Sequence, residues 1–89
     1  MANASSHDLA PKHGARFVFT RQHGEDDPPV YTVDVHRPDR AVERLAVRCG
    51  HPITLEPIPR DTRVAEAVTK LARALKRQPK ARLVRWREI

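Results

Sequence analysis

The sequence DTRVAEAVTKLARALKRQPKARLVRWREI, residues 61–89, determines most of what can be inferred about the fold. It contains apolar residues spaced at i, i+4, i+7 and i+11, the pattern of one face of an α-helix, namely Val64, Val68, Leu71 and Leu75. Asp61 or Thr62 can cap the first turn of this helix, and Pro79 ends it because proline has no amide hydrogen to donate. The spacing therefore predicts an amphipathic helix between Thr62 and Pro79.

The opposite side of this helix is basic. At about 100° per residue, four cations fall within about 80° of one another on the side away from the apolar stripe, namely Arg63, Lys70, Arg73 and Arg77. Glu66 lies within the same stripe, where it can pair with Lys70 four residues further on. Residues 81–89 (ARLVRWREI) follow, rich in Val, Leu, Trp and Ile, and predict a final strand with imperfect alternation.

Two strands and a loop are predicted nearer the N-terminus. Residues 16–21 (RFVFTR) and 30–36 (VYTVDVH) alternate as strands do, and the acidic, proline-containing residues 22–29 (QHGEDDPP) read as the loop between them. Two strands joined this closely predict an antiparallel hairpin. Residues 1–14 show no periodicity and predict a flexible N-terminal arm.

The middle of the chain predicts a first helix and a short strand. Pro38 and Asp39 resemble a helix start, and Gly50 a helix stop. Between them the apolar residues have i, i+1, i+4, i+5 and i+8 spacing, namely Ala41, Val42, Leu45, Ala46 and Cys49. Residues 53–56 (ITLE) are short and alternating, which favours a strand.

These elements predict one small α+β domain over residues 15–89. Their order is β-β-α-β-α-β, which indicates two layers, with both helices packed on a four-stranded mixed sheet. The β-α-β-α-β part of this order permits right-handed crossovers, so some parallel pairing is expected. The strand order cannot be read from the sequence, and no motif selects a known family.

The positive charge is concentrated in the last third of the chain. Residues 58–89 contain ten Lys or Arg and three acids, a net charge of +7, whereas residues 1–57 sum to −1. Several cations on one surface attract polyanions because binding releases the condensed counterions of the partner. Alternatively, such residues only solubilise the outside of an amphipathic helix.

From this charge we predict a non-catalytic, regulatory or accessory protein that binds the phosphate backbone of DNA or RNA. The predicted contacts come from the basic helix and the last strand: Arg63, Lys70, Arg73, Lys76, Arg77, Lys80, Arg82, Arg85 and Arg87. The alternative is a small protein-interaction module or inhibitor that docks its basic helix, or an edge of its sheet, on an acidic protein. A homodimer formed through an open sheet edge is compatible with either function.

Trp86 has two interpretations. It could stack on an unpaired base, with Arg85 and Arg87 gripping the backbone. Alternatively the ring is buried in the core, with both arginines on the other side of the sheet. Because a chain with one tryptophan needs that volume in its core, the sequence favours burial.

Cys49 is the one cysteine, which excludes a disulfide within the chain and favours a reducing, cytoplasmic location. Together with His51 and His36 it could ligate a metal, or with His51 form a nucleophile and base. Neither set has the spacing or the further partners that such sites require, so no metal, cofactor or catalytic residue is predicted. Because no apolar run reaches about 18 residues, no membrane segment is predicted either.

Overall fold

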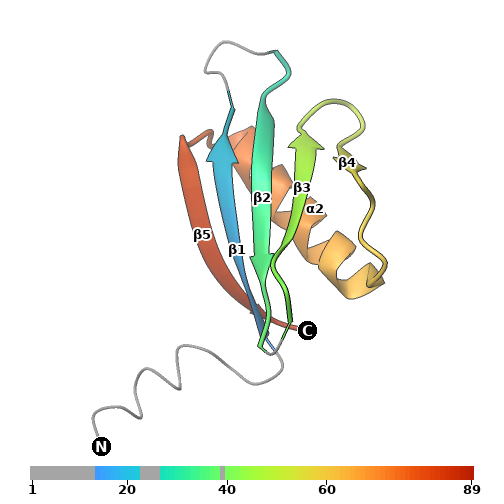
Figure 1. Cartoon of the computed structure of the whole chain (residues 1–89). Coiled ribbons are helices and arrows are strands. Elements are labelled where there is room, and N and C mark those ends of the chain that lie inside the picture. The colour runs from blue at the N-terminus through green and yellow to red at the C-terminus, as the bar shows by residue number, and fades with distance from the viewer. Residues whose placement is uncertain (1–13, 23–26, 39) are drawn as a thin grey trace, which may run out of the picture.

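The computed structural model describes residues 14–22, 27–38 and 40–89, which form five strands and one helix (Figure 1). In chain order the elements are β1 (Gly14–Arg21), β2 (Val30–His36), β3 (Glu43–Arg48), β4 (Thr54–Glu56), α2 (Thr62–Arg77) and β5 (Arg82–Glu88). The strands form one sheet in the order β4-β3-β2-β1-β5, and every neighbouring pair is antiparallel. The fold is a small α+β domain.

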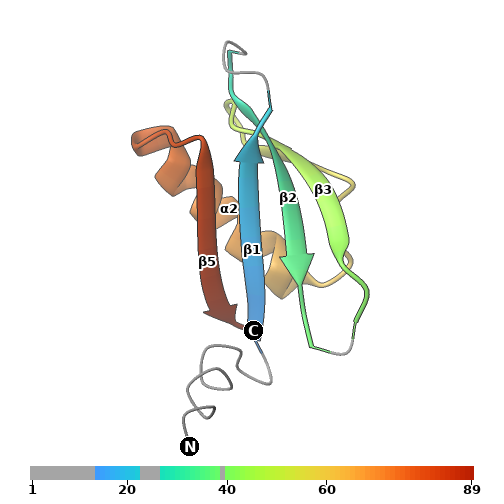
Figure 2. The same cartoon turned by 60° about the vertical axis from the view of Figure 1, so that its left-hand side comes forward.

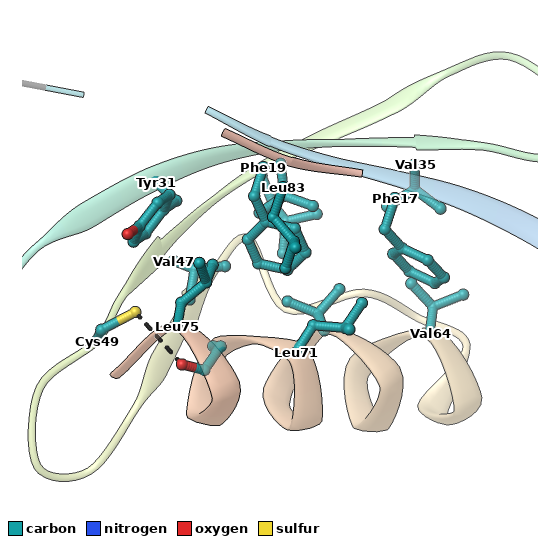
Figure 3. Close-up of a cluster of buried hydrophobic side chains, with 14 of the residues drawn as sticks. Phe17, Phe19, Tyr31, Val35, Val47, Cys49, Val64, Leu71, Leu75 and Leu83 are labelled. Atoms are coloured by element: carbon teal, nitrogen blue, oxygen red, sulfur yellow. Dashed lines mark hydrogen bonds between the residues drawn. The ribbon is translucent and has the colours of Figure 1, made fainter. Parts of the chain in front are cut away.

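Helix α2 covers one face of the sheet, and no described segment covers the other (Figures 1 and 2). We call the uncovered side the open face. The core lies between the helix and the sheet (Figure 3). There Phe17, Phe19 and Val33 of the central strands are fully buried against Val64 and Val68 of the helix.

The predicted helix is confirmed, and the structure selects Asp61 from the two candidate N-caps. Asp61 is the N-cap, and its carboxylate accepts a hydrogen bond of 2.9 Å from the Arg63 amide. At the other end the Gln78 amide donates to the Ala74 carbonyl, and Pro79 follows. The apolar stripe predicted from the sequence is the buried side of α2, and Ala72 adds to it.

The buried Tyr31 side chain connects the sheet to the turn after the helix. Its ring meets Phe19 edge-on, with 6.1 Å between the ring centroids. Its hydroxyl donates to the Lys80 carbonyl at 2.9 Å. This bond satisfies the buried hydroxyl and holds the start of β5 at a fixed distance from β2.

The helix predicted between Pro38 and Gly50 is wrong, because this segment contains strand β3. Leu45, Val47 and Cys49 alternate into the core, and β3 satisfies the backbone groups along the edge of β2. The described order is therefore β-β-β-β-α-β with one helix, and the sheet has five antiparallel strands instead of four mixed ones. The β1–β2 hairpin and the strands after residues 53 and 81 are confirmed.

Most of the predicted N-terminal arm lies outside the described residues, and β1 begins at Gly14, the last residue assigned to that arm. The acidic loop is likewise described only at Gln22 and from Asp27 onward. Among the described residues no helix is both long and apolar enough to cross a membrane.

Candidate nucleic-acid interface

The outer side of α2 carries an arc of four cations, which includes one acid, Glu66. Because α2 buries its apolar stripe against the sheet, the residues on the opposite side of the helical wheel must face solvent. All four cations in the arc are exposed: Lys70, Arg73, Lys76 and Arg77. Helical geometry thus gathers residues spread over two turns into one surface.

Strand β5 places its basic residues on two different faces. Arg85 lies opposite Phe17 and Arg87 lies opposite Ala15, so both arginines share the helix-bearing side of the sheet with these core residues. Arg82 lies opposite Thr20, two residues in register from Val18, and therefore belongs to the open face.

Two shallow hollows join α2 to β5. One, of about 130 Å³, is lined at its rim by Lys80, Arg85 and Arg87, and the other, of about 270 Å³, brings Lys70 next to Arg87. The hollows therefore join one helix cation, Lys70, and Lys80 to the two arginines of β5, and we group these with the other exposed cations on the outer side of α2. We call this group the helix-side basic surface and define it by seven residues: Lys70, Arg73, Lys76, Arg77, Lys80, Arg85 and Arg87.

No cation of this surface forms an ion pair with a described carboxylate. The ion pairs among the described residues join Arg37 and Arg63 to Asp61, and Arg44 to Asp34, and none includes a member of the surface. The Glu66–Lys70 pair that the sequence permits is not formed. Two described carboxylates, Glu66 and Glu88, line the same hollow as Lys70 and Arg87, but neither forms an ion pair with a member of the surface.

Three of the seven side chains are positioned by neutral carbonyls. Lys76 Nζ donates to the Gly50 carbonyl at 3.0 Å. Arg85 donates to the Val84 carbonyl at 2.8 Å, and Arg87 donates to the Trp86 carbonyl at 2.9 Å. These bonds orient the cationic groups and leave their charge in place.

Two of the nine predicted contact residues are not counted in this surface, although Arg63 lines the same hollow as Lys70 and Arg87. Arg63 is committed to Asp61, whose carboxylate accepts from its backbone amide, its Nε and its terminal guanidinium nitrogen. These bonds, with a further one from Arg37, hold the pKa of the Asp61 carboxyl well below its usual range. The other exception is Arg82, on the open face.

The predicted burial of Trp86 is wrong. Its side chain is 39% exposed on the open face, because it lies opposite Arg16 in the β1–β5 register. The Arg16 guanidinium carbon is 6.0 Å from the ring centroid, within cation–π range. No pattern in the sequence identified Arg16, since its proximity to Trp86 depends on a strand pairing that spans nearly the whole described chain.

Cys49 and His51 do not form a reactive pair. The thiol is buried and donates to the Ala72 carbonyl at a sulfur–oxygen distance of 4.0 Å, and burial raises its pKa. His51 is exposed, with Nδ1 3.4 Å from Lys76 Nζ. Within residues 14–22, 27–38 and 40–89, no three His, Cys, Asp or Glu side chains gather as a metal site would require.

No protein-family model matches this chain, and neither the curated proteins nor the solved structures contain a significant match to it.

Proposed function

We propose that the protein is a non-catalytic nucleic-acid-binding protein that contacts the phosphate backbone through the helix-side basic surface. The observation that supports this best is the gathering of seven cations on one side of the molecule, none of them paired with a described carboxylate. The sequence alone was also compatible with cations scattered around the molecule or paired one by one with carboxylates. Neither arrangement would support the binding of a polyanion.

The chemistry of the surface suits phosphates better than bases. Arginine presents a planar fork that binds phosphate through two parallel hydrogen bonds, and lysine acts as a mobile point charge. The outer side of α2 offers Arg73 and Arg77 one helical turn apart. Contacts of this kind position a nucleic acid without reading its sequence, so weak sequence preference is expected.

The test is fluorescence anisotropy with labelled oligonucleotides at several salt concentrations, comparing wild type with Arg73→Ala/Arg77→Ala. We expect binding that weakens steeply with salt, because each phosphate neutralised by the protein releases counterions. The double variant should bind more weakly. Its log–log salt slope should be shallower by about 2, because each Arg–phosphate pair contributes about 1 to that slope.

Arg40→Ala/Arg48→Ala is the matched control, since it removes the same charge from exposed positions outside the helix-side basic surface. Its slope should stay close to that of wild type. Equal slopes for wild type and Arg73→Ala/Arg77→Ala would contradict a role for this surface. Absence of any nucleic-acid binding at low salt would reject the function and leave an acidic protein as the partner to seek.

A further inference from the structure

A second feature, on the side of the sheet away from the helix, bears on which nucleic acid is bound. Three side chains form a row across the open face, because Arg16 of β1 lies opposite both His36 of β2 and Trp86 of β5. Next to Trp86 in this face lies an apolar strip, in which Val18 is buried and Val84 is half-buried. No described segment packs over the row (Figure 2).

We infer that Trp86 is a stacking site for an unpaired base, so that the protein binds single-stranded nucleic acid in preference to a duplex. This inference rests on the proposed function and specifies its ligand. Every base has a π-face, and stacking on an aromatic side chain needs that face to be free. In a duplex both faces are covered by neighbouring bases, so only an unpaired base can use Trp86.

Arg16 strengthens this site in two ways. Its guanidinium carbon lies over one face of the indole, 6.0 Å from the ring centroid, an attraction that favours this ring orientation, so a base stacks on the opposite face or displaces Arg16. A guanidinium plane can also stack on a base, and its charge attracts the adjoining phosphate. Arg16 and Trp86 together therefore offer stacking and charge at one place.

Strand β5 connects the stacking site to the helix-side basic surface. Arg85 and Arg87 flank Trp86 in sequence but lie on the helix-bearing side of β5, whereas the indole lies on the open face. Arg82 shares the open face with Trp86, about 14 Å away at four residues along a strand. A backbone running along β5 can therefore contact Arg85 and Arg87 while one of its bases turns onto Trp86.

The experiment uses the intrinsic fluorescence of Trp86, which is the one tryptophan of the chain. The protein is titrated with oligothymidylate and with a fully paired duplex of two complementary strands of equal total charge, with anisotropy measured in parallel. The single strand should quench Trp86 as it binds, whereas the duplex should bind through phosphate contacts with little quenching.

Two substitutions separate stacking from charge. Trp86→Ala should weaken binding of the single strand about 5- to 140-fold, the range expected when one stacked base is removed, and leave duplex binding unchanged. Trp86→Phe keeps an aromatic face and should retain most of the affinity. Far-UV circular dichroism checks the fold of both variants, and quenching in the wild type does not depend on either being stable.

The outcomes separate this inference from the proposed function. Tight, salt-dependent binding with no quenching, or with equal affinities for Trp86→Ala and wild type, would overturn the stacking site while the phosphate-binding function stands. A clear preference for the duplex would overturn it as well. Absence of binding to either oligonucleotide at low salt would overturn both.

Discussion

At the scale of single residues, Asp61 has the densest set of polar contacts among the described side chains. Its carboxylate caps α2, pairs with Arg63 at 3.1 Å and pairs with Arg37 at 3.2 Å. Arg37 follows β2, so one carboxylate connects the end of a central strand to the first turn of the helix. These contacts lower the pKa of Asp61, led by the hydrogen bonds from Arg63.

The lowered pKa predicts how stability depends on pH. A carboxyl that is more acidic in the folded state stabilises the fold above its unfolded pKa of about 3.9, and this contribution is lost as the pH falls toward the folded value. Asp61→Asn keeps a capping oxygen but removes the charge. Its urea midpoint should be below that of wild type at pH 7, and the gap should narrow as the pH is lowered below about 4.

The comparison of Asp61→Asn with wild type isolates the effect of Asp61. The pKa of Asp34, which Arg44 lowers, affects the stability of both proteins equally. Glu66→Gln removes a carboxylate that forms no ion pair with a described residue and should leave the midpoint nearly unchanged at each pH. A gap between Asp61→Asn and wild type that stays constant down to pH 2 would contradict the assignment.

Residue roles could be predicted where they depend on neighbours in sequence. The N-cap of α2 could be narrowed to Asp61 or Thr62, because both directly precede a periodic apolar stripe. Trp86 could not be placed, because in a short alternating strand the two faces differ only through what packs on them. The alternation correctly placed Trp86 on the opposite face from Arg85 and Arg87. The helix, however, covers the face that carries the two arginines, and not the face that carries Trp86 as the sequence favoured.

At the scale of elements, the apolar pattern predicted α2 correctly and β3 wrongly. The α2 pattern extends over about three turns and fits only a helix. The β3 segment is short, and its apolar residues fit either Ala41, Val42, Leu45 and Cys49 on a helix or Leu45, Val47 and Cys49 on a strand. The segment forms a strand because the edge of β2 needs a partner for its backbone hydrogen-bonding groups. The sequence of residues 38–50 alone does not reveal this requirement.

The two sides of α2 should respond differently to truncation. Leu71 is 4% exposed within the core, so Leu71→Ala should lower the free energy of unfolding by about 2–5 kcal/mol. Arg73 faces solvent and forms no described ion pair, so Arg73→Ala should change it by less than about 0.5 kcal/mol. Urea denaturation followed by circular dichroism measures both. Similar decreases in the two variants would mean that α2 is not packed as described.

At the scale of the whole molecule, charge and topology are coupled. The +7 of residues 58–89 could be counted from the sequence, but its distribution over the surface depended on the fold. The helix gathers four cations on its outer side, and the β1–β5 register adds Arg85 and Arg87 to the same side. The β1–β5 register could not be predicted from the sequence, because strand order is set by packing between distant segments.

Crowded cations should make the fold sensitive to ionic strength. Like charges on one surface repel in the compact state, and salt screens that repulsion over a Debye length of about 10 Å at 0.1 M. Raising sodium chloride from about 20 to about 200 mM should therefore raise the thermal midpoint by a few degrees. This shift corresponds to an increase of less than about 1 kcal/mol in the free energy of unfolding. Arg73→Ala/Arg77→Ala should show a smaller rise, and a midpoint that falls with salt would contradict the argument.

The pairing of β5 with β1 has a consequence for the order of assembly. The other three pairings join consecutive strands and can close one hairpin at a time, whereas β1 and β5 must meet across nearly the whole described chain. Bringing distant segments together costs entropy before any contact repays it, so this closure is expected to limit the refolding rate. Until it occurs, the unpaired edge of β1 is available for pairing between chains.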